Sequence, residues 1–223
     1  MGSDLSNAEH ASVALTHVVL VRHGETTWNQ ARRVQGTLDS PLSPLGRRQA
    51  EAVAHTLAPE PLAFLYSSDL GRTQESAAAL ARITGLPVRL DPRLRERCYG
   101  VLQGKTWPEI EIECPEAFER LNARDPEYLP PQGESASAFR ERVLASVTEI
   151  ARQHAGERGV IVTHGGVVGI MYRHTLDIAL SAKRDYALLN ASINRFRFVD
   201  GRWHLDTWGD VSHVDSLDPR DEI

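Results

Sequence analysis

Residues Leu20–Asn29 read LVRHGETTWN and overlap the end of an apolar run that begins at Thr16. The run, THVVLV, is short, continuous and rich in β-branched residues, which is typical of a strand buried on both faces of a parallel sheet. It ends in Arg22, His23 and Gly24. In an open α/β sheet, ligand-binding side chains lie where the strands end, so this stretch predicts both the first strand and the reaction centre.

The rest of the chain alternates short apolar runs with helical patterns. Further buried strands are predicted over residues 62–66, 88–90 and 159–163. Helices are expected between them, and their ends carry the usual signals, such as a cap at Ser43 and a terminal glycine at Gly85. This alternation predicts the α/β class, as a three-layer αβα sandwich with a mostly parallel central sheet.

One domain is expected between two short tails. Residues 1–15 are small and polar, with neither a helical nor a strand period, which predicts a loose N-terminal tail. The domain covers residues 16–210, and an acidic, proline-containing stretch at 106–131 predicts a small helical insertion near the active site. Near the end, Asp200-Gly201 predicts a hairpin of two edge strands, followed by a polar C-terminal tail at 211–223.

The composition narrows the function classes. A chain of 223 residues that is 41% hydrophobic can bury a substantial core. Its formal net charge of −5 argues against general nucleic-acid binding, which needs a basic face. Cys98 and Cys114 are too few for a disulfide framework or a cysteine-rich metal site, and no HExxH motif occurs. We therefore expect no nucleic-acid partner and no metal.

The chain carries no evident membrane or export signal. No apolar run approaches the ~20 residues that a transmembrane helix needs. The polar start, MGSDLSNAEHAS, lacks the apolar stretch of a secretory signal. We expect no membrane partner and a cytoplasmic location.

Polar residues stand at three predicted strand ends. Arg22 and His23 follow the first strand, Arg72 lies just past the second, and His164 follows GVIVT. The carboxyl ends of parallel strands meet at one edge of the sheet, so these residues should form a small electropositive bowl suited to a phosphoryl group. Gly165 and Gly166 follow His164 and open a helix, whose backbone N–H groups could add to this anion site.

Each of these residues also has a structural interpretation. A single histidine at a strand end is more often structural than catalytic, and Arg72 alone would be a surface helix residue. Glu96 is the nearby carboxylate that the short strand VRL would bring to the same edge, but within RLRER it could equally be a solvated charge. Repetition at equivalent positions of the topology favours the functional interpretation.

Two other classes compete with an enzyme built on this bowl. The segment GVLQGKT has three residues between its glycines, whereas the phosphate-binding P-loop needs four and follows a buried strand. A phosphate-recognising scaffold without turnover is compatible with the fold. The presence of both His23 and Glu96 argues against such a scaffold.

Several segments, taken in order, resemble one family. They are LVRHGETTWN, QGTLDSPLSPLGRRQA, YSSDLGRTQESA, LRERCYGVLQGKTWPEI, PPQGES, VIVTHGGVV and the final W-x-L-x-x-W hairpin. Together they resemble the histidine phosphatase superfamily, which includes cofactor-dependent phosphoglycerate mutases and fructose-2,6-bisphosphatases. The similarity covers roughly residues 16 to 209.

This resemblance implies a role for each residue of the bowl. His23 would be the nucleophile that accepts the phosphoryl group, which requires a neutral imidazole with one ring nitrogen held by a hydrogen bond. Glu96 would be the acid and base, while Arg22, Arg72 and His164 would stabilise charge on the phosphoryl oxygens. The resemblance implies no cofactor, and it also places further residues near the phosphate or the substrate: Asn29, Gln35 and Gly36.

The acceptor of the phosphoryl group distinguishes two reactions. ERCYGVLQGK resembles the mutase segment that holds the glycerate carboxylate, with Tyr99 and Lys105 in matching places. The stretch ARDPEYLPPQGES, however, lacks the paired arginines with which mutases retain a bisphosphorylated intermediate. We expect a phosphatase acting on a phosphorylated sugar or small acid, with mutase as the alternative. The C-terminal hairpin offers an edge that could pair with a second subunit in a homodimer.

Overall fold

The computed structural model describes residues 15–214, and they are organised around a six-stranded sheet. The strand order is β3-β2-β4-β1-β5-β6. β1 pairs in parallel with β4, β4 with β2 and β2 with β3, whereas β5 runs antiparallel to both β1 and β6. The strands are β1 Thr16–Arg22, β2 Phe64–Ser67, β3 Val88–Leu90, β4 Arg158–Thr163, β5 Ile193–Val199 and β6 Arg202–Asp210.

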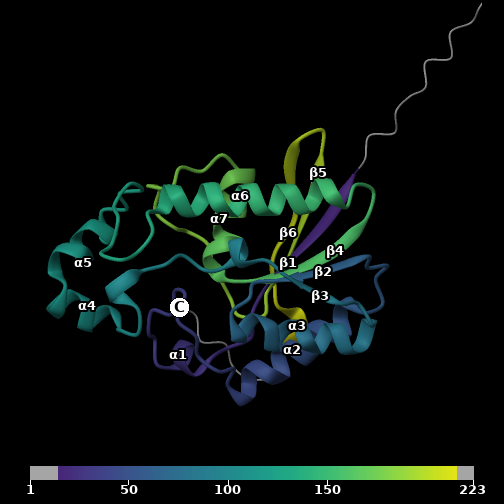
Figure 1. Ribbon diagram of the computed structural model, residues 1–223, viewed down its shortest axis with the longest axis horizontal. Coiled ribbons are helices and arrows are strands. Elements are labelled where there is room, and N and C mark those ends of the chain that lie inside the picture. Colours follow the sequence, from purple (N-terminus) through teal and green to yellow (C-terminus); the bar gives the residue numbers. More distant parts are fainter. Residues whose placement is uncertain (1–14, 215–223) are drawn as a thin grey trace, which may run out of the picture.

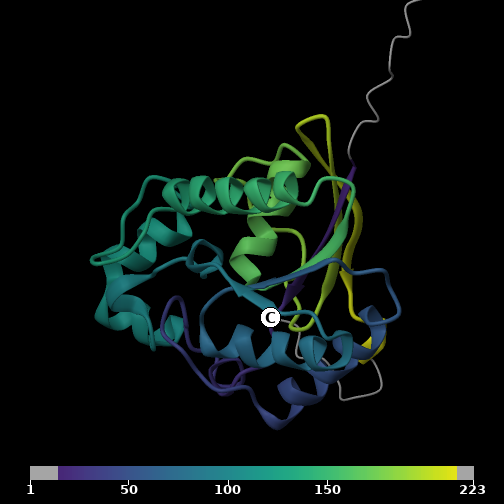
Figure 2. The same ribbon diagram turned by 45° about the vertical axis from the view of Figure 1, so that its right-hand side comes forward.

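Helices cover both faces of this sheet, which confirms the predicted αβα sandwich. In Figure 1, α2 and α3 lie below the strands and α6 and α7 lie above them, and Figure 2 shows the same layers after a turn of 45° about the vertical axis. The principal helices are α2 Pro44–Leu57, α3 Gly71–Thr84, α6 Ala136–Gln153 and α7 Gly165–Thr175. The remaining elements are α1 Thr27–Gln30, α4 Trp107–Glu113 and α5 Pro115–Asn122, with 3₁₀ turns at Pro92–Leu94, Gly100–Leu102 and Ser212–Val214.

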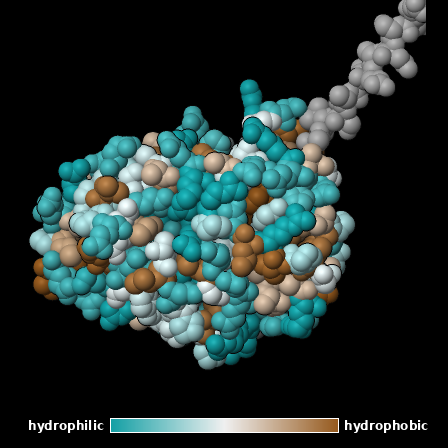
Figure 3. Space-filling view, viewed as in Figure 1, coloured by the Kyte–Doolittle hydropathy of each residue, from teal (hydrophilic) through white to brown (hydrophobic). Residues whose placement is uncertain are grey.

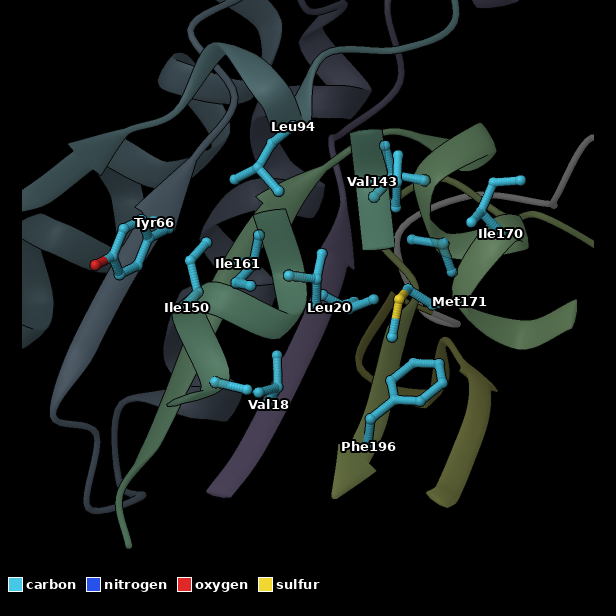
Figure 4. Packing of buried hydrophobic residues seen from close by; sticks show 14 of the residues in the cluster. Val18, Leu20, Tyr66, Leu94, Val143, Ile150, Ile161, Ile170, Met171 and Phe196 are labelled. Carbon is cyan, nitrogen blue, oxygen red and sulfur yellow. The ribbon is translucent and has the colours of Figure 1, made fainter. Parts of the chain in front are cut away.

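Alternate residues of the central strands fill two separate cores. Val18 and Leu20 of β1 pack with α6 and α7, whereas Val19 and Val21 pack with α2 and α3. Figure 4 shows the first of these cores, where strand residues meet Met171 and other side chains from the helices. All four β1 residues are at most 2% exposed. The continuous apolar run therefore reflects a strand that is buried on both faces.

Local sequence signals determine where the helices begin and end. The Ser43 hydroxyl accepts a hydrogen bond from Gly46 N at 2.9 Å, and Ser135 caps α6 in the same way. Gly85 ends α3 with a left-handed φ of 73°. At the start of α7, by contrast, His164 makes no side-chain capping bond, so its side chain is free for another role.

Two predicted strands differ from the structure. β2 begins at Phe64 because the backbone N–H of Leu62 is used in a turn with Glu60 O. The hairpin at Asp200-Gly201 is present, with φ values of 51° and 73°, but β5 is not an edge strand as predicted. It lies between β1 and β6, so the edges of the sheet are β3 and β6.

The packed chain continues past the predicted boundary at 210. Val211 is 8% exposed and Val214 is 5% exposed, and both belong to the core beside α2. The rest of the predicted tails, residues 1–14 and 215–223, falls outside the described residues. Within 15–214, no helix is long and apolar enough to cross a membrane.

The predicted insertion consists of the short helices α4 and α5, which lie at one end of the molecule (Figure 1). Ile110 of α4 and Ala117 of α5 form a small apolar cluster with Leu102, which lies in the turn before the insertion. On the face seen in Figure 3, hydrophobic residues are scattered in small groups among hydrophilic ones. Two large hydrophobic side chains of α4 are exposed: Trp107 at 43% and Ile112 at 80%.

Candidate active site

The carboxyl ends of three adjacent strands meet at one pocket. β1 delivers Arg22 and His23, β4 ends just before His164, and the loop after β2 leads into α3 with Arg72 near its start. The backbone N–H of His23 donates to Thr163 O at 2.9 Å, which joins the first two ends directly. A pocket of about 280 Å³ opens at this edge and is lined by His23 and both arginines.

The His23 ring is held in one tautomer. Its Nδ1 lies 2.7 Å from Gly24 O, and because a carbonyl oxygen only accepts hydrogen bonds, Nδ1 must donate. Nε2 is then left with its lone pair. The side chain is 3% exposed, and burial, followed by the charges of Arg72 and Arg22, lowers its pKa well below the ordinary value. His23 is therefore a neutral imidazole whose Nε2 is nucleophilic near pH 7.

Arg22 and Arg72 are fixed by main-chain carbonyls. A terminal nitrogen of Arg22 donates to Leu188 O. Arg72 is 1% exposed and donates to Gly36 O at 2.7 Å and to Leu38 O at 2.8 Å. Desolvation lowers the pKa of Arg22 to about 10, so it still carries its charge at neutral pH. Both guanidinium groups are thus pre-oriented before any ligand arrives.

His164 directly follows β4 and is completely buried. Its Nε2 is 2.9 Å from the Ser68 hydroxyl, and its ring centroid is 5.4 Å from that of His23. Burial lowers its pKa well below the ordinary value, so its ring is neutral too. If Ser68 donates to Nε2, then Nδ1 carries the ring proton.

Three buried nitrogens at this edge have no hydrogen-bond partner within residues 15–214. They are Nε of Arg22, Nε of Arg72 and Nδ1 of His164. Buried donors are almost always satisfied in folded proteins, so a cluster of unsatisfied ones indicates a ligand that accepts from them. A tetrahedral oxyanion has acceptors in several directions and fits such a set.

Glu96 reaches the same pocket from the loop after β3. Its Oε2 accepts from Gly166 N at 2.8 Å and its Oε1 accepts from Arg97 N at 2.8 Å. A Cβ atom at position 166 would overlap the Glu96 carboxylate, so the close approach requires glycine there. The start of α7 therefore holds a carboxylate beside His23 in the pocket.

The sequence profile of the histidine phosphatase superfamily (branch 1) matches residues 18–211. The chain belongs to this superfamily.

Similar proteins include both phosphatases and mutase-like proteins. A metal-independent phosphoserine phosphatase of Arabidopsis thaliana is 40% identical over 91% of this chain and 85% of its own length. The phosphoglycerate mutase-like protein 4 of the same plant is 39% identical over 94% and 92%. The solved structure of Bacillus stearothermophilus YhfR superposes with a TM-score of 0.84 at 36% identity, covering 90% of this chain and all of YhfR.

Most of the residues that the sequence predicted to bind the substrate line the pocket: Asn29, Gln35, Gly36, Tyr99 and Gly165. Lys105 does not, because its ammonium group pairs with Glu113 of α4. Of the two residues that the resemblance of ERCYGVLQGK to the mutase segment suggested, Tyr99 therefore lines the pocket and Lys105 does not. No group of three or more His, Cys, Asp or Glu residues that could hold a metal ion occurs in residues 15–214.

Several lining residues of this histidine phosphatase were not anticipated from the sequence. Arg184 and Leu188 come from the segment between α7 and β5, which has no motif of its own. Gly166, which the sequence pairs with Gly165 at the start of the helix, lines the pocket as expected. The lining residues that the sequence did not single out are Arg33, Val34, Trp107, Arg184 and Leu188.

A second layer of contacts supports the main chain at His23. The Asn190 amide donates to His23 O at 3.1 Å and to Asn29 Oδ1 at 3.3 Å. Ala191 N donates to the carbonyls of Arg22 and His23, and His213 Nε2 lies 3.0 Å from Ala191 O. The segment before β5 and the turn after β6 therefore both support the end of β1.

Proposed function

We propose that this histidine phosphatase is a phosphomonoester hydrolase that acts on a small phosphorylated metabolite through a phosphohistidine at His23. The observation that carries the proposal is the set of three unpartnered buried nitrogens around a histidine whose tautomer exposes Nε2. The naming of a similar protein as a phosphoserine phosphatase supports the same reaction class.

In the first step, Nε2 of His23 attacks phosphorus and the bond to the ester oxygen breaks. Protonated Glu96 gives its proton to the departing alkoxide oxygen. Arg22, Arg72 and His164 donate hydrogen bonds to the phosphoryl oxygens as charge redistributes. The carbonyl of Gly24 stabilises the cationic phosphoimidazole through the Nδ1 proton.

In the second step, water attacks phosphorus of the phosphohistidine and the P–N bond breaks. The Glu96 carboxylate takes a proton from that water and returns to its acid form. Inorganic phosphate leaves, and His23 is again neutral with a free Nε2. Glu96 gives one proton to the alkoxide and regains one from water, so the proton balance closes at Glu96, and the Nδ1 proton of His23 stays in place throughout.

The test compares wild type with His23→Ala on an aryl phosphate, combined with rapid acid and alkaline quenching. A nucleophile substitution should lower kcat by at least about 10⁴-fold and abolish an acid-labile, alkali-stable phosphoenzyme. His204→Ala is the matched control, since His204 is exposed on β6 and away from the pocket. Equal activity of wild type and His23→Ala, or the absence of a phosphoenzyme in wild type, would contradict the proposal.

A mutase is the second candidate, because a similar protein is named mutase-like. Retention of a bisphosphorylated intermediate requires additional cations from the insertion. Among the described lining residues, Trp107 alone comes from the predicted insertion, and Arg120 pairs with Asp125 instead. This arrangement favours hydrolysis. Incubation with 3-phosphoglycerate and a trace of its bisphosphate distinguishes the two, because a mutase would form 2-phosphoglycerate faster than it releases phosphate.

A cytoplasmic location and a homodimer remain predictions from the sequence. β6 is an edge strand of the sheet, so we propose that two copies pair through it. Light scattering of the purified protein measures the mass directly. A monomer at all concentrations would contradict this prediction.

A further inference from the structure

Arg184 differs from the other cations of the pocket. It is exposed at the outer part of the lining, whereas Arg72 is buried at the phosphoryl end. Within residues 15–214 its guanidinium has neither an ion pair nor a hydrogen bond. Arg33, the other outer arginine, is 3.0 Å from Glu109 and donates to Gly104 O at 2.6 Å. Arg184 is thus the outer guanidinium that is available to a ligand.

The segment that carries Arg184 is anchored on one side by aromatic packing. The Tyr186 ring lies 4.3 Å from that of Tyr172 and 5.3 Å from that of Trp208, measured between centroids. The Tyr186 hydroxyl also donates to Gly169 O at 3.5 Å. These contacts tie the segment to α7 and β6.

Hydrogen bonds from arginine side chains to main-chain carbonyls anchor the segment on both sides of Arg184. Arg173 donates to the carbonyls of Ala179 and Ala182, at 2.6 and 3.0 Å. On the other side, Arg22 donates to Leu188 O, which links the segment to the phosphoryl end. The base of the Arg184 side chain is therefore fixed relative to the phosphate site.

The electrostatics of the pocket also call for a second negative group. Its lining includes four arginines, and Glu96 is the one carboxylate among the described lining residues. Arg33 is paired with Glu109 and Arg72 with Asp39, so within residues 15–214 Arg22 and Arg184 are the two lining arginines without an ion pair. Desolvation lowers the pKa of Arg22, the charge of Glu96 raises it in part, and the charge of Arg184 lowers it further. An anion beside Arg184 would relieve this repulsion between like charges.

We propose that Arg184 binds a carboxylate of the substrate, so that the preferred substrates are small phosphomonoesters of carboxylic acids. This inference rests on the proposed phosphatase function. A carboxylate carries one negative charge, which one unpaired guanidinium matches in a planar, two-bonded geometry. A second phosphate carries more charge and would need a further free cation, but Arg33 is already paired with Glu109.

The test uses two substrates that differ only at the group in question. 3-Phosphoglycerate carries a carboxylate where glycerol 3-phosphate carries a hydroxymethyl group. Wild type should show a higher kcat/KM for 3-phosphoglycerate, and Arg184→Gln should lower this preference about tenfold, since a charged hydrogen-bonded pair contributes about that much. Arg184→Lys should restore part of it, and Lys183→Gln, which removes the neighbouring exposed cation outside the lining, should not change it.

Each outcome has a separate meaning. Failure of wild type to hydrolyse p-nitrophenyl phosphate would refute the phosphatase function itself. Hydrolysis of that ester without a preference for 3-phosphoglycerate would refute the carboxylate site alone. An equal loss on both glycerol-based substrates in Arg184→Gln, or an equal change of preference in Lys183→Gln, would also refute it. A loss confined to 3-phosphoglycerate and absent in the control would support it.

Discussion

The two ends of the pocket are built in opposite ways. The phosphoryl end consists of side chains at the ends of packed parallel strands, where Arg72 and His164 are at most 1% exposed. The outer end consists of loop and insertion residues such as Trp107 and Arg184, which are exposed. Rigid, desolvated donors strengthen interactions with developing charge, whereas exposed groups are screened by water. We therefore expect substitutions at the inner end to affect the chemical step and those at the outer end to affect substrate preference.

Arg72→Ala is expected to have the largest of the four effects that follow. It removes a pre-oriented guanidinium, and loss of one such donor typically lowers kcat by about 10²–10³-fold. Arg72→Lys should recover little, because a point charge does not replace the fixed guanidinium. Steady-state kinetics on an aryl phosphate measures both, with the exposed Arg48→Ala as control. A change in KM with kcat unaltered would mean that Arg72 affects substrate binding, as the outer residues are expected to, and would contradict the difference between the two ends.

Gly166→Ala should come next. A Cβ atom there would overlap the Glu96 carboxylate and displace the proposed acid. Loss of a positioned acid should slow alkyl phosphates about 10²-fold and aryl phosphates much less, since aryl leaving groups need less protonation. Gly169→Ala on the same helix is the control, because its Cβ would meet Tyr186 at an ordinary 3.5 Å. Equal losses on both ester types would argue against this role of Glu96.

We expect the two buried histidines to make stability depend on pH, which is a smaller effect than the losses of activity above. The folded state lowers the pKa values of His23 and His164, so the unfolded chain binds more protons as pH falls. The stabilisation is present above the ordinary histidine pKa of about 6.5 and is lost below it, by up to about 1.4 kcal/mol per pH unit for each residue. Urea unfolding between pH 7.5 and 5.5 measures the slope. His23→Asn should flatten it, whereas an unchanged slope would show that His23 is not protonated on unfolding.

Trp107→Ala should have the smallest effect on the chemical step. Its ring is 43% exposed and lies 6.4 Å from Phe118, so its removal leaves the inner donors in place. We expect kcat on p-nitrophenyl phosphate to change by less than about threefold, while KM values differ among substrates. A large loss of kcat on every substrate would mean that the two ends are not separable.

The phosphoryl end of the pocket was also the part that could be predicted from the sequence. Parallel strands converge at their carboxyl ends, so residues far apart along the chain, such as Arg22 and His164, could be placed together without a structure. The outer end could not, because Arg184 is positioned by Tyr186 packing against Trp208, a contact between distant segments. For the same reason, the turn signal at Asp200-Gly201 predicted the hairpin but not that β5 would pair with β1.

The support under His23 has a consequence for the order in which the protein can become functional. His23 is among the first residues of the domain to be synthesised, yet the backbone at this position is held by Asn190 and Ala191, and Ala191 is in turn contacted by His213. The backbone at His23 can therefore reach its final geometry only after nearly the whole domain has left the ribosome. Chains that end before Asn190 would therefore carry Arg22, His23 and Gly24 without the contacts that hold them in place.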